Sequence, residues 1–195
     1  MAIRVLAAAV VSAVLMFIWG FVFWAVLGGG AMIHDPLPAD NELDILAVMR
    51  SSNLPTGMYL YPFPAEFGDE AGTAEAERKV EEGPRLQLAY VKEGGAAMEP
   101  VTMAKGFAHM AVVALLAAAL TAMAAGGLPT FARRFAFVLL VAVTAAVWAN
   151  LDDAIWWMHP ARYAAGVMIY QIVAGALMAV VIAALVKRRD SGAIA

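Results

Sequence analysis

The sequence predicts an all-α membrane protein: a four-helix transmembrane bundle with a small α+β extracytoplasmic domain inserted between the first and second helices. Of its 195 residues, 63% are hydrophobic and only 15% are charged, whereas soluble domains are about 45–50% apolar and about 25% charged. The apolar residues fall into four blocks, and a helix of ~20 apolar residues crosses a bilayer. Most acidic residues lie in one stretch between the first two blocks.

The four apolar blocks give the expected transmembrane helices. The first covers residues 3–27 and exceeds the roughly 7–15-residue apolar core of a signal peptide, so we expect it to be retained. The third is the shortest and must borrow residues at its ends to span the membrane. The second, third and fourth helices are expected at residues 101–123, 134–148 and 162–186.

Basic residues predict the orientation of these helices. They lie before the first helix, between the second and third, and after the fourth, which is one side of a four-span protein; they are Arg4, Arg133, Arg134 and the run Lys187-Arg188-Arg189. The positive-inside rule makes that side cytoplasmic. Tryptophans fall near the opposite interface, where amphipathic rings prefer to lie; they are Trp19, Trp24, Trp148, Trp156 and Trp157.

The chain is expected to divide into four segments. They are transmembrane helix 1 (1–30), an acidic extracytoplasmic domain (31–100), transmembrane helices 2–4 (101–186) and a cytoplasmic tail (187–195). Ala-rich helices and short cytoplasmic loops are typical of a bacterial inner membrane. We therefore expect a multi-pass protein of the cell inner membrane with both termini cytoplasmic and residues 31–100 periplasmic.

The inserted domain is expected to contain two helices and two strands. Asp40 is the expected N-cap of a helix that reaches Ser52, and residues 74–82 have the composition of a charged helix stopped by Gly83-Pro84. Residues 57–61 and 85–91 are expected strands, because each is a short β-prone run between turn residues. A domain of this size buries little surface, so we expect it to rest on the helices or on a neighbouring subunit.

The charge of this domain restricts its partners. Residues 32–100 contain 13 acidic and 5 basic residues, a net charge of −8. Such a surface repels nucleic acid and anionic lipid headgroups, and it favours cations or basic partners. A plainer interpretation is that the charge only keeps a small domain soluble.

Histidine and methionine occur together on the predicted outer side and suggest a metal site. The candidate ligands are His34, His109, His159, Met32, Met110 and Met158. Imidazole and thioether groups together suit copper, and neighbouring carboxylates extend the choice to another divalent ion. No two histidines have the i, i+4 spacing of a helical metal site, so interfacial histidines and lipid-facing methionines are the alternative interpretation.

A few polar side chains lie within the expected transmembrane helices. They are Lys105, His109, Tyr170 and Gln171. Polar groups inside a membrane are costly and often functional. As a further alternative, they predict an oligomeric channel or a small-solute permease lined by these four residues.

The preferred functional prediction rests on the absence of catalytic and cofactor-binding motifs from the sequence and on helix packing. The chain has no cysteine, which excludes disulfides and thiolate-bound metals, and no phosphate-binding loop or HExxH motif. We therefore expect no enzyme activity. Gly175 and Ala179 have the small-xxx-small spacing that allows close helix contact, within the bundle or with another subunit. These features favour a non-catalytic accessory or scaffold subunit that packs against another integral membrane protein, or against a second copy, among membrane lipids.

Overall fold

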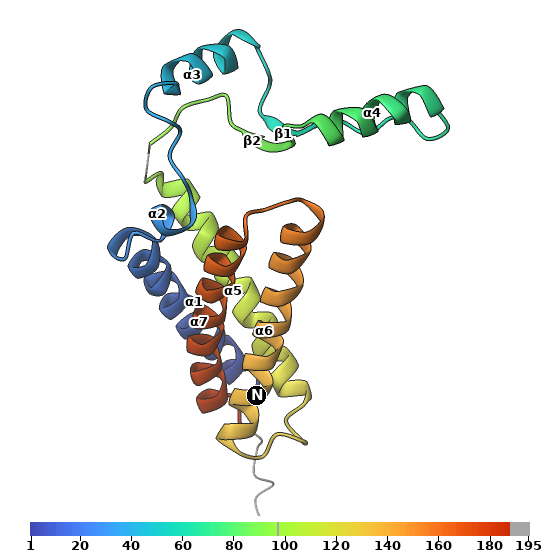
Figure 1. Ribbon diagram of the computed structural model, residues 1–195. Helices are drawn as coiled ribbons and strands as arrows, with labels where there is room; N and C mark the ends of the chain where they lie inside the picture. Colours follow the sequence, from blue (N-terminus) through green and yellow to red (C-terminus); the bar gives the residue numbers. More distant parts are fainter. Residues whose placement is uncertain (97, 188–195) are drawn as a thin grey trace, which may run out of the picture. The chain divides into compact units, whose positions relative to one another are not determined.

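The computed structural model describes residues 1–96 and 98–187, and Figure 1 labels its helices and strands. The chain divides into two compact units, one formed by Met1–Asp35 with Met98–Ala195 and the other by Pro36–Ala97. We call the first the helical unit and the second the inserted unit. The predicted tail from residue 188 onward, with Arg188 and Arg189, lies outside the described residues.

Within the described residues, the helical unit contains four helices that are long and apolar enough to cross a membrane, as predicted. The first is continued at its carboxyl end by the π-helical turn η1, Val22–Val26. The four helices are α1 (Ala2–Phe21), α5 (Pro100–Met123), α6 (Phe131–Trp156) and α7 (Ala161–Leu185).

Helix α6 is longer than the predicted 134–148, and that prediction was wrong at both ends. At its start, the Thr130 hydroxyl accepts a hydrogen bond from the Arg133 N–H (3.2 Å) and caps the helix. At the other end, Asn150 was expected in an extramembrane segment. It instead lies buried within α6, where its side-chain amide donates to the Ala146 carbonyl (2.7 Å). The hydrogen bond satisfies the polar side chain and allows it to be buried within a helix.

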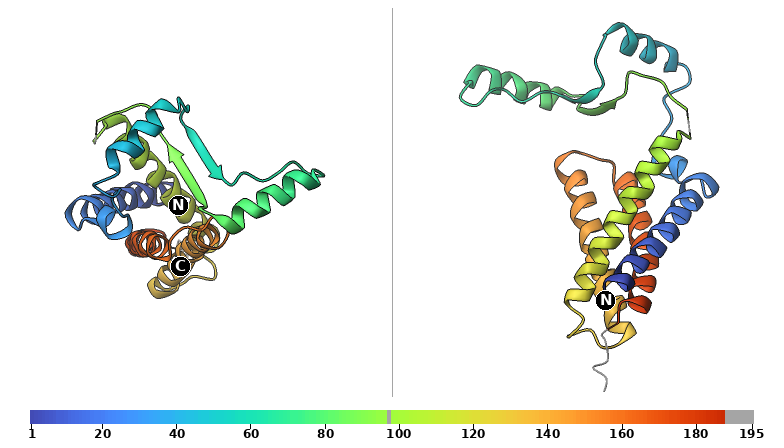
Figure 2. Two further views of the ribbon diagram at one scale, coloured as in Figure 1. Left: turned by 45° about the horizontal axis from the view of Figure 1, so that its top comes forward. Right: turned by 180° about the vertical axis from the view of Figure 1, so that it is seen from behind.

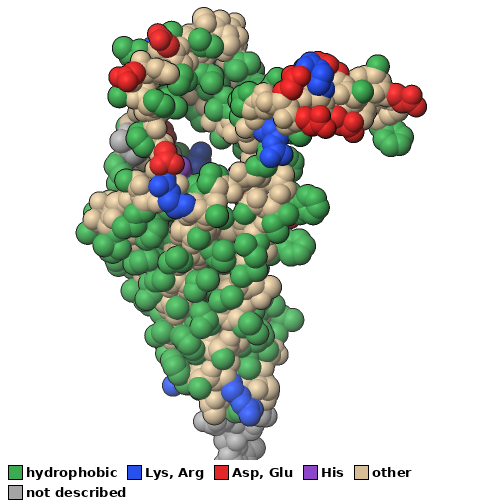
Figure 3. Space-filling model, viewed as in Figure 1, with side chains coloured by type: hydrophobic (Ala, Val, Ile, Leu, Met, Phe, Trp, Pro, Cys, Tyr) green, Lys and Arg blue, Asp and Glu red, His purple; other side chains and the backbone are tan. Residues whose placement is uncertain are grey.

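The long helices pack in the order α5–α1–α7–α6, which can be followed in Figures 1 and 2. Their core consists mainly of small side chains, so the backbones approach closely and associate through dispersion. The bundle is open between α5 and α6, because these two helices share few contacts. Hydrophobic side chains cover most of the visible face of this unit in Figure 3. Fully buried core residues include Ala8, Ala13, Ala114, Ala118, Ala179, Ile182 and Ala183.

A short helix that the sequence did not predict follows the first long helix. Gly28 adopts a left-handed conformation (φ 69°), which glycine adopts without steric cost, and the chain then forms α2, Gly29–Ile33. The Ile33 side chain is buried. Directly after α2, Asp35 accepts a hydrogen bond from the Arg162 guanidinium at the start of α7 (2.7 Å).

The inserted unit is the expected small α+β structure. It contains α3 (Glu42–Ser51), β1 (Gly57–Tyr61), α4 (Glu70–Glu82) and β2 (Leu86–Tyr90). The two strands pair antiparallel, with Gly57 opposite Tyr90 and Tyr61 opposite Leu86. Both predicted strands are thus confirmed.

Both helix starts in the inserted unit differ from the prediction. The N-cap of α3 is Asn41 and not Asp40, and it makes no side-chain cap hydrogen bond. Helix α4 begins at Glu70 and not at Ala74, because the Asp69 carboxylate accepts a hydrogen bond from the Gly72 N–H (2.9 Å). This side-chain cap satisfies one of the free N–H groups of the first turn.

Polar contacts hold the strand ends of the inserted unit together. The Thr56 hydroxyl donates to the Glu93 carboxylate (2.7 Å) and accepts from the Lys92 N–H (3.0 Å). The Lys92 ammonium donates to the Asn53 side-chain oxygen (2.8 Å). The hydrogen bond from Thr56 lowers the pKa of Glu93 below its ordinary value.

Candidate functional site

Two of the three candidate metal-binding histidines flank one tyrosine in the helical unit. The rings of His34 and His159 both lie edge-on to Tyr163, with centroids 5.3 and 5.4 Å from it. The His34 Nδ1 lies 3.0 Å from the Gly30 carbonyl oxygen, and the His159 Nδ1 lies 3.9 Å from an Asp153 carboxylate oxygen. The short helix α2 and the α6–α7 turn bring these residues to one place.

The third histidine lies elsewhere. His109 is on α5, where it and Met110 line a groove beside α6 and α7. Met32 and Met158 are exposed. Among the described residues, no group of three or more His, Asp or Glu is placed to hold a metal ion. The copper hypothesis remains a prediction.

The groove beside His109 has a volume of about 450 Å³. It exists because α5 packs on α1 and α6 packs on α7, while α5 and α6 stay apart. On the α5 side it is lined by Val113, Leu116 and Leu120. Helix α6 contributes mainly alanines, including Ala145 and Ala149, and these small side chains leave the space open.

Polar groups reach one end of this groove. Tyr170 and Gln171, both predicted as intramembrane polar residues, line it together with His109, whereas Lys105 does not. The Gln171 side-chain oxygen accepts a hydrogen bond from the Asn150 amide (2.7 Å). This pairing was not predicted, because Asn150 lies beyond the predicted end of the third helix at residue 148. The available signal was the alanine-rich face of α6, which continues to Asn150.

An aromatic cluster supports the same end of the groove. Trp19, Phe23 and Trp24 all contact the Tyr170 ring, with centroid distances of 6.3, 5.1 and 5.3 Å. The Trp19 indole N–H donates to the Tyr170 carbonyl (3.1 Å). Gly20 makes room for the tyrosine, because an added Cβ there would lie 3.3 Å from the Tyr170 hydroxyl. Two of the predicted interfacial tryptophans therefore pack around Tyr170.

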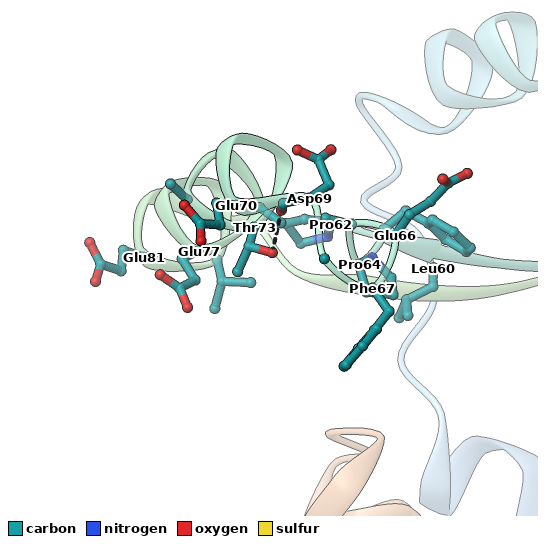
Figure 4. Close-up of a pocket in the computed structure, with 16 residues that line it drawn as sticks. Leu60, Pro62, Pro64, Glu66, Phe67, Asp69, Glu70, Thr73, Glu77 and Glu81 are labelled. Carbon is teal, nitrogen blue, oxygen red and sulfur yellow. Dashed lines mark hydrogen bonds between the residues drawn. The ribbon is translucent and has the colours of Figure 1, made fainter.

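The inserted unit has a second, wider hollow between the 62–69 loop and α4, with a volume of about 1030 Å³. Phe63 and Phe67 line it; Phe63 is 76% exposed and Phe67 is fully exposed. Figure 4 shows Phe67 extending from the loop and acidic side chains projecting from α4. We call this surface the aromatic–acidic face; its acidic members are Glu66, Asp69, Glu70, Glu77 and Glu81.

Another set of α4 side chains carries a network of ion pairs. The Arg78 guanidinium contacts the carboxylates of Glu75 (2.7 Å) and Glu82 (2.6 Å), one turn before and one turn after it. Lys79 adds a contact to Glu75 at 3.3 Å. The hydrogen bond from Arg78, followed by that from Lys79, lowers the pKa of Glu75 to about 2. These pairs stabilise the helix and do not line the aromatic–acidic face.

The two surfaces differ in the chemistry that they offer. The groove in the helical unit presents an apolar wall with a few hydrogen-bonding groups at one end. The aromatic–acidic face presents exposed rings among carboxylates. Comparison with known proteins assigns neither surface: no protein-family model, no curated protein and no solved structure matches the chain.

Proposed function

We propose that the protein is a non-catalytic accessory or scaffold subunit of a membrane complex, which docks a partner protein through the inserted unit. One observation carries this proposal: no described residue from Pro36 to Ala96 is buried. Even a domain of about 60 residues ordinarily buries about 60% of the surface of its unfolded chain. The inserted unit keeps its apolar side chains available for contact with another molecule.

The exposed residues are of the kind that protein interfaces use. Phe63 and Phe67 lie on a proline-rich loop beside α4, and Leu43, Val48 and Met58 are also exposed. Exposed apolar patches on soluble surfaces mark interaction sites. Aromatic side chains dominate the binding energy of many interfaces because they bury a large area at a low entropic cost.

The charge of the aromatic–acidic face indicates the partner. The carboxylates of Glu70, Glu77 and Glu81 line the same hollow as the exposed rings. They attract a basic partner during encounter and repel an acidic one. The partner is therefore a protein segment that combines apolar residues with lysine or arginine.

The helices supply the anchor in this proposal. Four apolar helices cross a bacterial inner membrane, with both termini cytoplasmic and the inserted unit periplasmic. Arg4, Arg133 and Lys187 support this topology, because the positive-inside rule favours the cytoplasm for such residues. Each of them adjoins the end of a long helix.

A photo-crosslinking experiment tests the docking proposal. A photoreactive amino acid replaces Phe67 in the full chain, and crosslinks are collected in intact cells and identified by mass spectrometry. We expect one abundant crosslink to a second membrane or periplasmic protein, through a segment rich in lysine or arginine. The matched control is position 71, because Ala71 is exposed on α4 but does not line the aromatic–acidic face.

Two outcomes contradict the proposal. Crosslinks from position 67 that reach only the chain's own helices mean that the apolar side chains are covered within one molecule. Equal crosslinking from positions 67 and 71 means that the aromatic–acidic face has no preferred partner.

A further inference from the structure

The groove between α5 and α6 has the polarity of a site for an amphiphilic molecule. At one end lie His109, Tyr170 and Gln171. Toward the other end, Leu116 and Leu120 follow on α5, at ~1.5 Å per residue along the helix. The groove therefore changes from polar to apolar along its length, as a molecule with one polar group and one apolar chain requires.

The size of the groove distinguishes a lipid chain from a helix. Its volume is about 450 Å³, which lies within the range of about 300–1,000 Å³ that is usual for small-molecule sites. A four-turn helix about 10 Å across occupies on the order of 1,700 Å³. A partner helix could insert only side chains here, whereas a single acyl or prenyl chain fits whole.

The polar end offers a hydrogen-bond donor. Asn150 donates to both the Ala146 carbonyl and the Gln171 side-chain oxygen, each at 2.7 Å. This arrangement fixes the orientation of the Gln171 amide. Its Nε2 donor has no hydrogen-bond partner among the described residues, and His109 lines the same groove. The complementary ligand group is an oxygen that accepts a hydrogen bond.

The depth of this donor selects the class of ligand. His109 lies nine residues from the start of α5, and Gln171 lies ten residues from the start of α7, so both are roughly 14 Å along their helices. This step rests on the proposed membrane placement, in which that depth is well inside the hydrocarbon layer. A phosphate or ammonium headgroup is too costly to bury there, whereas a neutral carbonyl oxygen is tolerated once it is hydrogen-bonded.

We propose that the α5–α6 groove binds a neutral membrane lipid with a carbonyl head group and a single prenyl or acyl chain. The carbonyl oxygen accepts a hydrogen bond from the Gln171 Nε2, beside His109. The chain runs along Val113, Leu116 and Leu120, opposite the alanines of α6. The groove lies in the helical unit and the aromatic–acidic face lies in the inserted unit, so the two proposals concern different residues.

Decylubiquinone, which has carbonyl oxygens and a ten-carbon chain, is a suitable probe for the full-length protein in detergent. Trp19 and Trp24 contact Tyr170, so a quinone in the groove quenches their fluorescence. We expect saturable quenching by the wild type. Decylbenzene has the ring and the chain without the oxygens. Its affinity, measured by competition with the quinone, should be about tenfold lower than that of the quinone.

Groove-filling variants test the location. Ala145→Leu and Ala149→Leu place larger side chains in the groove and should each weaken quinone binding about tenfold or more. Ala108→Leu is the matched control, because Ala108 is exposed on α5 and does not line the groove; it should leave the affinity unchanged. Gln171→Met removes the donor and should weaken binding about threefold to tenfold.

The results separate this proposal from the docking proposal. Equal affinity for the wild type and both filled variants means that the quinone only partitions onto the helix surface, and it overturns the site. If decylbenzene binds with the same affinity as the quinone, the proposed role of the Gln171 donor is wrong. Crosslinking at position 67 is measured independently, so a failed quinone experiment leaves the docking result unaffected. Size-exclusion profiles identify any variant that misfolds, and the two filled variants test the groove independently of each other.

Discussion

At the scale of single residues, one glycine determines how closely the short helix α2 approaches α7. A Cβ added at Gly166 on α7 would overlap the Cγ2 methyl of Ile33, and Ile33 is buried. We predict that Gly166→Ala destabilises the protein by about 1–3 kcal/mol, the usual cost of overpacking. Thermal unfolding in detergent, followed by tryptophan fluorescence, measures the change.

Gly106→Ala is the matched control for this substitution. Gly106 lies within α5, and an added Cβ there meets no atom within 4 Å. Alanine in a helix interior is favoured over glycine by about 0.5–1 kcal/mol, so this variant should be as stable as the wild type or more stable. A loss of stability equal to that of Gly166→Ala would mean that contact with Ile33 is not the cause.

Two adjacent arginines have different roles in the structure. Arg134 is only 4% exposed, and its guanidinium donates to the carbonyls of Ala183 (2.9 Å), Leu128 (3.0 Å) and Pro129 (3.0 Å). It thereby holds the α5–α6 loop against the end of α7. Arg133 is exposed.

We predict that Arg134→Met lowers the free energy of unfolding by about 1.5–3 kcal/mol, because buried carbonyls lose a charged donor. Arg133→Met removes the same charge and should change the stability by less than about 0.5 kcal/mol. Parallel thermal melts compare the two variants. Equal losses would indicate that total charge matters and that the three hydrogen bonds do not.

At the scale of elements, the ion pairs of α4 give the inserted unit a defined pH response. The folded-state pKa of Glu75 is about 2, lowered from 4.5 by Arg78 and then by Lys79. A lowered carboxylate pKa stabilises the fold above the unfolded-state value, and that contribution disappears as the pH falls from about 4.5 to about 2. The groups are solvent-exposed, so the effect on stability is small.

NMR titration of the Glu75 carboxyl in the full chain measures this pKa directly. We predict a midpoint near 2 in the wild type and a clear rise toward 4.5 in Arg78→Gln. Lys79→Gln should give a smaller rise, because Arg78 is the larger cause. A wild-type midpoint near 4.5 would show that the ion pairs do not persist in solution.

Elements were predictable from sequence where local pattern decides them. Strand β1 has the predicted bounds, because a β-prone run lies between Gly57 and Pro62 and proline cannot continue the ladder. The end of α6 was not predictable in this way. Asn150 and the two aspartates after it resemble the start of a loop. In the structure Asn150 is buried and hydrogen-bonded to Gln171 on α7, a tertiary contact that local pattern does not encode.

The candidate groove was predictable only in part. Tyr170 and Gln171 stand out in the sequence because polar residues are rare inside apolar helices. Their grouping with His109 depends on which helices pack together. Helix periodicity does not encode the separation of α5 from α6, nor does it show that His34 and His159 meet at Tyr163.

At the scale of the whole molecule, the two units are stabilised by different means. The helical unit has a close-packed core of small side chains. The inserted unit has exposed or partly exposed residues throughout its described length, and it is held by strand pairing, a capped helix and ion pairs. A domain with so little core depends on an additional contact for its stability, which is the physical basis of the docking proposal.

The proposed topology puts the inserted unit and the α5–α6 loop on opposite sides of the membrane. The chain has no cysteine, so single-cysteine variants report one position each. Gly94→Cys and Gly126→Cys are matched, since an added Cβ meets no atom within 4 Å at either position.

We predict that a membrane-impermeant maleimide applied to outer-membrane-permeabilised cells labels position 94 at once, and position 126 only after the inner membrane is disrupted. The positive-inside rule gives this order, because Arg133 and Arg134 lie in the first turn of α6, directly after the loop that contains position 126. Labelling of position 126 alone would invert the topology. Equal labelling of both positions before disruption would mean that α5 does not cross the membrane.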